Sequence, residues 1–263
     1  MISKFKSLRW TMPLLMLLGL QMAAIAQQGQ GPGNPPGPGQ GPGPGGFRPP
    51  NISVPIQSDT SRTLGAYFSV AVTPKKAPDA KGFVQRWLVM DPIKKDIARN
   101  NILTENYLRA AVDTLNFSTD FTMVPKKESV SKMGDQEYKW RAIDSKLFNF
   151  KLHRYSYAMS KPQYGVLYWV VTIIDCPQEI KNVRMMAGCN SAGMFWLNGE
   201  EALVIPGDKD MVVDHCASKL LTLKKGRNIV RGAIINGPGM IDFSMRFLDE
   251  QARPVKNFTL SFE

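Results

Sequence analysis

From residue 64 onward, apolar runs alternate with short polar turns in a pattern that is typical of β-strands. The segment Gly165–Ile174 carries β-branched and aromatic residues at both odd and even positions, which predicts a strand buried on both faces. Residues 241–247 instead alternate apolar with polar side chains, as in a strand with one solvated face. Short strands separated by Gly and Asn turns predict an all-β fold, a β-sandwich or jelly roll.

Two local signals predict individual elements of this domain. Asn198-Gly199 lies between the apolar runs 194–197 and 202–205, and Asn-Gly favours a two-residue hairpin turn because both residues tolerate a positive φ. One short helix is expected after Thr104, whose side chain can cap its first turn. The apolar residues of its buried face recur at helical spacing: Leu103, Tyr107, Leu108, Ala111, Val112 and Leu115.

The first 26 residues differ in kind from the rest. Lys4, Lys6 and Arg9 precede a short apolar run that ends in Ala-Ile-Ala at residues 24–26. A basic start, an apolar middle and a small-residue exit predict a secretory signal peptide. The apolar run is shorter than the ~20 residues of a membrane-spanning helix, and no later stretch has that length. We therefore expect a mature protein that is secreted, periplasmic or at the cell surface, without a transmembrane span.

Residues 27–50 are predicted to be a disordered linker, which leaves residues 51–263 as the β-sandwich domain. Between residues 29 and 50, 17 of 22 positions are Gly or Pro, so the segment has almost nothing to bury. The glycines do not recur every third residue, which excludes a collagen-like helix. The linker is interpreted either as a spacer that holds the domain away from a surface or as a tolerated disordered N-terminus.

The net charge of +11 comes from 33 Lys and Arg against 22 Asp and Glu. Cleavage of the signal peptide would remove three basic residues and leave a net charge of +8. Much of this charge stands in Lys-Lys pairs beside Pro, Gly or polar residues, which indicates solvated loops. Attraction to an acidic polysaccharide or an anionic envelope is the alternative. The pairs are not interleaved with aromatics, so we expect no nucleic-acid partner.

A catalytic constellation is hard to assemble because the chain has only two histidines. The best arrangement for an enzyme pairs Ser191 with His215 and with Asp214 or another acid. Asp214 directly precedes His215, however, and neighbouring residues on a strand point to opposite faces. The other histidine, His153, is expected to be a surface residue on a basic strand. We therefore expect a non-catalytic protein, with a carbohydrate acetylesterase as the alternative.

Metal and disulfide chemistry is also limited by composition. Two His and three Cys leave little for a His/Cys metal cage, so no cofactor is expected. A structural Ca²⁺ held by Asp, Asn and backbone oxygens remains an option. Cys176, Cys189 and Cys216 are interpreted as small buried thiols, with a disulfide between Cys176 and Cys189 as the alternative.

Aromatic side chains offer the clearest route to a function, because exposed rings can stack on the flat C–H faces of sugars. Trp87, Trp169 and Trp196 lie inside apolar runs and are expected in the core. Trp140 lies between Lys139 and Arg141. These flanking charges make Trp140 the candidate for an exposed platform.

Several motifs, taken in their order along the chain, resemble a known group of domains. The polar turn and strand at 190–199 and the later segment 221–228 resemble galactose-binding-like jelly-roll domains of secreted carbohydrate-active enzymes. A wider set resembles the non-catalytic region of acetylxylan-esterase-type proteins of Bacteroidota: Gly82–Ile93, Trp140, Phe148-Asn149, Asp214-His215 and Phe243-x-x-Arg246-Phe247. In those proteins the hydrolase is a separate segment, for which these 263 residues leave no room.

The resemblance implies a secreted, non-catalytic carbohydrate-binding or accessory domain of a polysaccharide-degrading system. Its ligand would be a polysaccharide or oligosaccharide, with a xylan-like glycan as the specific expectation and a degrading enzyme as a candidate partner. A structural envelope protein that needs no ligand is a further alternative. The residues expected to bind the glycan are aromatics, amides and one histidine: Trp140, Asn149, Tyr168, Asn190, Asn198 and His215.

Overall fold

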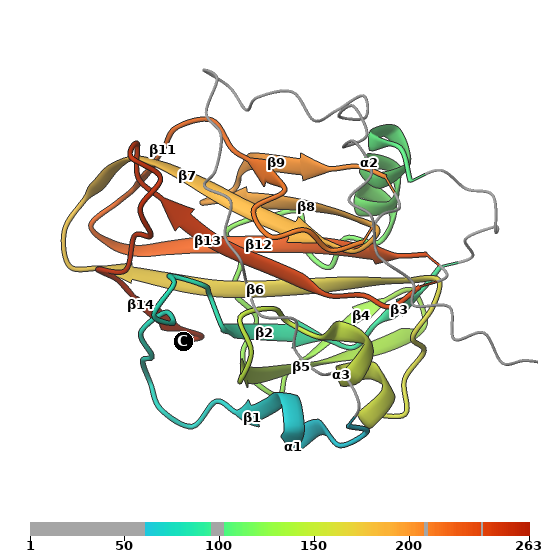
Figure 1. Cartoon of the computed structure of the whole chain (residues 1–263). Coiled ribbons are helices and arrows are strands. Elements are labelled where there is room, and N and C mark those ends of the chain that lie inside the picture. The colour runs from blue at the N-terminus through green and yellow to red at the C-terminus, as the bar shows by residue number, and fades with distance from the viewer. Residues whose placement is uncertain (1–60, 96–102, 208–209, 238) are drawn as a thin grey trace, which may run out of the picture. The chain divides into compact units, whose positions relative to one another are not determined.

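The computed structural model describes residues 61–95, 103–207, 210–237 and 239–263. The predicted signal peptide and linker lie outside these residues, so both stay predictions. Within the described ranges the chain forms two antiparallel sheets and three helices (Figure 1). The all-β sandwich predicted from the apolar pattern is confirmed.

The helices are short, and no described helix is both long and apolar enough to cross a membrane. They are α1 (Leu64–Tyr67), α2 (Glu105–Thr114) and α3 (Leu152–Ala158). The strands are, in chain order, β1 (Phe68–Val70), β2 (Arg86–Met90), β3 (Ile93–Lys94), β4 (Val130–Met133), β5 (Gln136–Ser145), β6 (Val166–Cys176), β7 (Ile180–Cys189), β8 (Ala192–Leu197), β9 (Glu200–Ile205), β10 (Cys216–Ala217), β11 (Leu221–Leu223), β12 (Gly226–Asn236), β13 (Phe243–Leu248) and β14 (Thr259–Ser261).

The large sheet is built around β6. Along one edge β6 pairs with β12 over its whole length, from Val166 opposite Asn236 to Cys176 opposite Gly226. Its other edge is shared by three shorter strands, β3, β2 and β14, which pair with successive stretches of it. The sheet continues through β5 and β1 beyond β2, and through β8 and β9 beyond β12.

The central strand of the small sheet is β7. Its residue Ala187 pairs with Met245 of β13 on one edge and with Cys216 of β10 on the other. β11 also pairs with β7 and follows β10 in the chain. Gly188 of β7 has no room for a side chain, because an added Cβ would overlap the carbonyl oxygen of Val212. The segment before β10 therefore lies directly against the strand.

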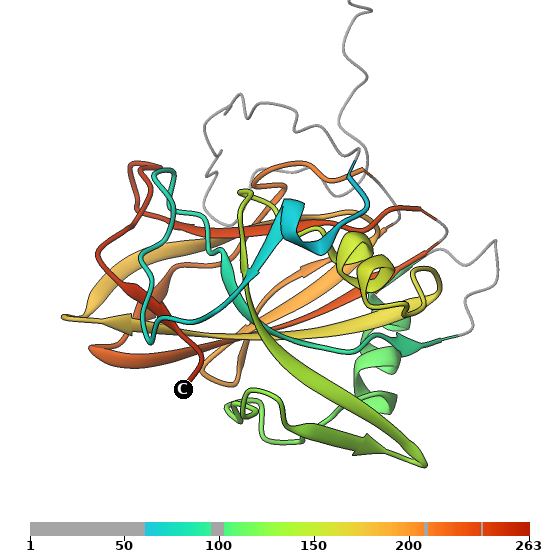
Figure 2. The same ribbon diagram turned by 90° about the horizontal axis from the view of Figure 1, so that it is seen from below.

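Two hydrophobic cores lie on opposite faces of the large sheet. The inner core fills the space between the two sheets, and the outer core includes residues of α2 and of the segment 115–124. Successive residues of β6 alternate between them: Tyr168 and Val170 belong to the inner core, and Trp169 and Val171 to the outer core. Figure 2 shows α2 and the β4–β5 hairpin on the side of the large sheet away from the small sheet. The predicted burial of this strand on both faces is confirmed.

Three tryptophans dominate the outer core. Trp140, Trp169 and Trp196 are at most 6% exposed. The ring of Phe117 packs edge-on against Trp140 and Trp169, with centroids 4.8 and 5.3 Å apart. Trp87 is completely buried in the inner core. The predicted core positions of Trp87, Trp169 and Trp196 are confirmed.

Arg246 of β13 is a completely buried cation with a carboxylate partner. Its Nε lies 3.0 and 3.1 Å from the two carboxylate oxygens of Asp214, and a terminal nitrogen donates to one of them as well. A second terminal nitrogen donates to the carbonyl oxygen of Lys81 at 3.0 Å. Asp214 itself is only 4% exposed, so the two charges form a buried ion pair.

Arg231 of β12 is also completely buried but is held in another way. Its guanidinium carbon lies 3.9, 4.3 and 4.2 Å from the ring centroids of Phe117, Phe121 and Trp169. Its terminal nitrogens donate to uncharged oxygens of the segment 116–120. Burial lowers the pKa of Arg231 to about 9, which still leaves the guanidinium charged at neutral pH.

Two predicted local elements are confirmed. Thr104 caps α2, since its side-chain oxygen accepts from the backbone N–H of Tyr107 at 3.2 Å. Asn198 and Gly199 connect β8 to β9 with positive φ angles of 52° and 87°, as the Asn-Gly signal requires. The expectation of one helix is wrong, because α1 and α3 also form.

The expectation that His153 lies at the surface of a basic strand is wrong. The segment forms α3, and His153 is only 6% exposed. Lys151 at the start of α3 gives no side-chain cap, whereas Leu152 and Tyr155 pack in the inner core. Tertiary packing rather than capping fixes this helix, which is why the local pattern did not predict it.

Candidate functional site

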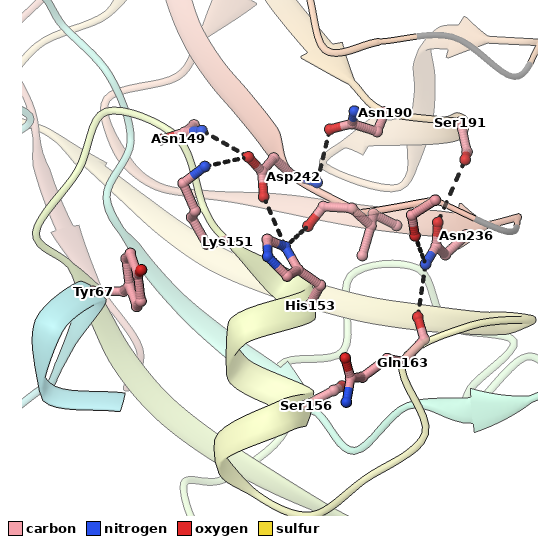
Figure 3. Close-up of polar contacts among 12 residues, drawn as sticks. Tyr67, Asn149, Lys151, His153, Ser156, Gln163, Asn190, Ser191, Asn236 and Asp242 are labelled. Atoms are coloured by element: carbon pink, nitrogen blue, oxygen red, sulfur yellow. Dashed lines mark hydrogen bonds and ion pairs between the residues drawn. The ribbon is translucent and has the colours of Figure 1, made fainter. Parts of the chain in front are cut away.

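A buried polar cluster lies where α3 meets the loop before β13. We call Asn149, Lys151, His153, Asn190 and Asp242 the Asp242 cluster (Figure 3). The Oδ2 atom of Asp242 accepts from Lys151 Nζ at 2.7 Å and from Asn149 Nδ2 at 3.0 Å. All of these side chains except Asn190 belong to residues at most 8% exposed. Direct pairing is needed here, because a buried charge without a partner is strongly destabilising.

The same cluster fixes the loop before β13 to its neighbours. His153 Nδ1 lies 3.3 Å from Asp242 Oδ1, and the His153 backbone N–H donates to the Ile241 carbonyl at 3.2 Å. The Asp242 N–H donates to Asn190 Oδ1 at 3.1 Å, and the Asn190 N–H donates to the Asp242 carbonyl at 2.9 Å. These reciprocal bonds join the loop both to α3 and to the turn between β7 and β8.

Asn236, at the end of β12, extends the polar network. Its Nδ2 donates to the carbonyl oxygens of Gln163 and Gly239 at 2.7 and 2.9 Å. The Ser191 hydroxyl donates to Asn236 Oδ1 at 3.5 Å and accepts from the backbone N–H of Gly237 at 3.2 Å. Three loops from distant parts of the sequence are thereby held together beside the Asp242 cluster (Figure 3).

Exposed apolar side chains border this polar end of the molecule. Tyr157, Tyr164 and Met240 are 42%, 53% and 56% exposed. Tyr157 follows His153 by about one turn of α3. Tyr164 and Met240 directly follow the two residues whose carbonyls hold Asn236. Within the described residues, Tyr157 and Tyr164 are the aromatic side chains with large exposure.

The structure brings two of the predicted glycan-binding residues together. Asn149 and Asn190 both bond to Asp242, the first through its side chain and the second through side chain and backbone. Tyr168 lies behind them: it is completely buried, and its hydroxyl is 2.7 Å from that of Ser156 on α3. Burial raises the pKa of Tyr168. Tyr168 therefore supports α3 from the inner core and does not offer its ring to a ligand.

The remaining predicted glycan-binding residues lie elsewhere. The expectation that Trp140 is an exposed platform is wrong, because the residue is completely buried in the outer core. Asn198 is the turn residue between β8 and β9, and its Nδ2 donates to Asn228 Oδ1 at 3.0 Å. His215 is half-buried in the segment before β10. Neither Asn198 nor His215 is among the residues of the Asp242 cluster.

The geometry disfavours the catalytic set of Ser191, His215 and Asp214. Both carboxylate oxygens of Asp214 accept from Arg246, so the acid that would orient the histidine is already committed. Ser191 is only 2% exposed and its hydroxyl bonds to Asn236. A nucleophile needs access to its substrate, and the burial of Ser191 leaves its hydroxyl little access.

Metal ligands do not gather in the part of the chain that the structure describes. There, no group of three or more His, Cys, Asp or Glu side chains is arranged to hold an ion. The structure has Cys176, Cys189 and Cys216 as thiols rather than in a disulfide. The expectation that they are buried is confirmed for Cys176 and Cys189 and is wrong for Cys216, which is half-buried. Burial raises the pKa of Cys176 to about 11, which keeps this thiol protonated at neutral pH.

Lys151, Asp242 and the two exposed tyrosines were not among the residues predicted from the sequence. A usable signal existed for Tyr164, which stands in a loop with Pro162 just before a glycine, since aromatics in loops are often exposed for function. No local pattern could place Asp242 beside Lys151, because 91 residues separate them.

Comparisons with known proteins find only a weak structural likeness at low sequence identity. No protein-family model matches the chain, and a search of curated proteins finds no match. Among solved structures, a PA14 sugar-binding domain from an RTX adhesin has a TM-score of 0.39 at 8% identity, covering 68% of this chain and 100% of that chain. The PA14 domain of the MpAFP antifreeze protein has a TM-score of 0.38 at 10% identity, covering 73% of this chain and 98% of that chain.

Proposed function

We propose that this protein is a non-catalytic carbohydrate-binding module whose binding surface is the polar end around Asp242. One observation carries the proposal: both strongly exposed aromatic side chains of the described residues, Tyr157 and Tyr164, belong to segments that this polar network holds. Tyr157 lies in α3 with His153, and Tyr164 follows Gln163, whose carbonyl accepts from Asn236. Exposed rings that are flanked by fixed amide and hydroxyl groups are the combination that recognises sugars, because the rings cover C–H faces while polar groups orient hydroxyls.

The supporting network makes such a surface rigid. Bonds from Asn236 to Gln163 and Gly239 hold the loops that carry Tyr164 and Met240, and the Asp242 cluster fixes the start of α3, which carries Tyr157. A rigid surface loses little conformational entropy when a ligand binds. This favours recognition of a stiff, extended ligand such as a polysaccharide chain.

The wider setting of this module is also part of the proposal. We propose secretion through the signal peptide of residues 1–26, and an accessory role in a system that degrades a xylan-like glycan. The first rests on the sequence of that segment and the second on the resemblance to acetylxylan-esterase-type proteins. A structural envelope protein without a ligand and an acetylesterase remain the competing hypotheses.

Affinity electrophoresis of the mature protein in gels containing different glycans tests the binding surface. Tyr157→Ala and Tyr164→Ala combined should weaken retention about thirtyfold, because each ring contributes on the order of 1 kcal/mol and about 1.4 kcal/mol is a factor of ten. Leu220→Ala is the matched control, since Leu220 is 43% exposed but belongs to the segment before β11. Tyr→Phe changes at both sites should retain most of the binding.

This experiment and an assay of acetate release together separate the competing hypotheses. Retention that is equal in the parent and in the double tyrosine variant would contradict the proposed surface. Absence of retention on every glycan would remove the binding function and favour the structural one. Release of acetate from acetylated xylan that His215→Ala abolishes would instead favour the acetylesterase.

A further inference from the structure

Most charged groups beside the two tyrosines are paired with one another. Lys151 and His153 lie against the Asp242 carboxylate, at 2.7 and 3.3 Å. The second carboxylate of this region, Asp91, is paired with Arg141 and lies 3.0 Å from Lys161 Nζ. Both carboxylates are at most 8% exposed and are already committed to protein cations. They are therefore poor partners for a positively charged ligand.

Lys94 stands apart from this pairing. It is the exposed residue of β3, and none of the described residues forms an ion pair or side-chain hydrogen bond with it. Its ammonium lies next to Gly165, since a Cβ added to that glycine would be 3.6 Å from Lys94 Nζ. Gly165 directly follows Tyr164, so the Lys94 ammonium approaches the residue next to this exposed tyrosine.

The strand pairing fixes this neighbourhood. Lys94 of β3 pairs with Val166 of β6, and the Lys95 backbone N–H donates to the Gly165 carbonyl at 2.7 Å. Gly165 has a φ of +60°, and a side chain there would also press on the Lys95 carbonyl, 2.8 Å from the Cβ position. A glycine is thus required between the tyrosine and β6, and it leaves open space for the lysine ammonium.

Among the described residues, the charge balance of this surface is positive. Asp242 neutralises Lys151, whereas the single carboxylate of Asp91 faces both Arg141 and Lys161. Lys94 adds a further positive charge that has no counterion within the described ranges. A surface with uncompensated positive charge attracts anions and disfavours cations. Sugar rings carry negative charge mainly as carboxylates. The positive charge of this surface therefore favours acidic glycans over neutral ones.

Resting on the proposed function, we infer that the glycan recognised at this surface is acidic, with the ammonium of Lys94 binding the carboxylate of a uronic acid residue whose ring stacks on Tyr164. Part of the positive net charge of the chain then binds the ligand directly at this surface. The tyrosines would supply affinity for any pyranose, and Lys94 would supply the preference for the charged one.

Pectin offers a matched pair of ligands, because its galacturonate carboxyls can be methyl-esterified or free on the same backbone. We expect retention of the full mature protein to be about tenfold stronger on the de-esterified form, as for one charge-assisted hydrogen bond. Lys94→Gln should remove this preference, and Lys94→Arg should keep it. Raising NaCl from about 50 mM to about 500 mM should reduce it through screening.

Lys224→Gln is the control for non-specific attraction, since Lys224 is also exposed but lies in the turn between β11 and β12. Equal retention on both pectins with loss in the double tyrosine variant would overturn the inference and leave the binding function standing. Equal loss of preference in Lys94→Gln and Lys224→Gln would also overturn it, because general charge would then explain the binding. No retention on any glycan would remove the proposed function and the inference together.

Discussion

The outer faces of the two sheets each bury an arginine, and they hold it by different means. On the small sheet, Arg246 is bound to the carboxylate of Asp214, which is itself buried. On the large sheet, Arg231 lies among three aromatic rings and uncharged oxygens of residues 116–120. The free energy lost on removing a buried cation therefore depends on whether an anion stays buried without a partner. Removing Arg246 leaves a buried anion without a cation, whereas removing Arg231 leaves no such anion.

Arg246→Met should have the largest effect. The carboxylate of Asp214 would stay buried without its cation, and breaking a buried pair in this way costs about 3–5 kcal/mol. The free energy of unfolding in urea measures the loss. The double variant Arg246→Met with Asp214→Leu should recover most of it. A loss below about 1 kcal/mol in the single variant would show that Asp214 reaches solvent.

Arg231→Met should cost less, about 2 kcal/mol at most, because it removes cation–π contacts but leaves no charge behind. The flexible thioether can fill the space among the three rings. Arg231→Lys should be the more damaging change, since an ammonium is more strongly hydrated and cannot reach several acceptors in one plane. A lysine variant as stable as the methionine variant would contradict the proposed role of the guanidinium.

The pH dependence of stability should also distinguish the two faces. Burial lowers the pKa of Arg231 to about 9, well below the ordinary value of a guanidinium group. Between these values the unfolded chain binds the proton and the folded chain releases it, so stability relative to Arg231→Met should rise with pH above about 9. The slope can reach about 1.4 kcal/mol per pH unit, measured as the difference in unfolding free energy. A constant difference from pH 8 to 10 would mean that the rings and oxygens keep the guanidinium charged.

The smallest effect is expected at an exposed arginine. Arg109 of α2 bonds to Glu105 and to Glu201 of β9, but its side chain is 41% exposed. Exposed ion pairs contribute about 0–1 kcal/mol, so Arg109→Ala should shift the unfolding midpoint only slightly. A loss comparable to that of Arg246→Met would reverse the ranking and point to α2 as the main cover of the outer core.

Much of the fold could be predicted from the sequence, because its signals are local. The Asn198-Gly199 turn, the cap at Thr104 and the doubly buried strand each depend on neighbours within a few residues. The prediction for Trp140 was wrong for the opposite reason, because its burial depends on distant residues. Its charged neighbours Lys139 and Arg141 indicated exposure, but successive residues of a strand point to opposite faces, and the segment that covers the tryptophan comes from about 20 residues away in the chain.

The candidate site was much less predictable than the fold. Asn149 and Asn190 were among the predicted residues, yet nothing local shows that both meet at Asp242. Asp214 was assigned to a catalytic set because it precedes a histidine, whereas the structure pairs it with Arg246, 32 residues later. Polar side chains that act across such separations carry no periodic signal, so only the folded arrangement reveals their partners.

The pairing of β6 has a consequence for how the molecule assembles. Both of its edges are completed by segments far away in sequence, such as Val89 of β2 and Ile234 of β12. Non-local pairing of this kind slows folding to milliseconds or seconds, whereas the β8–β9 hairpin can close within about 10 microseconds. We therefore expect β6 to pair with its neighbours in the large sheet only after the β8–β9 hairpin at the edge of the sheet has closed. Until then the most apolar strand has two open edges, which makes slow folding at high concentration the step at which this protein is most prone to aggregate.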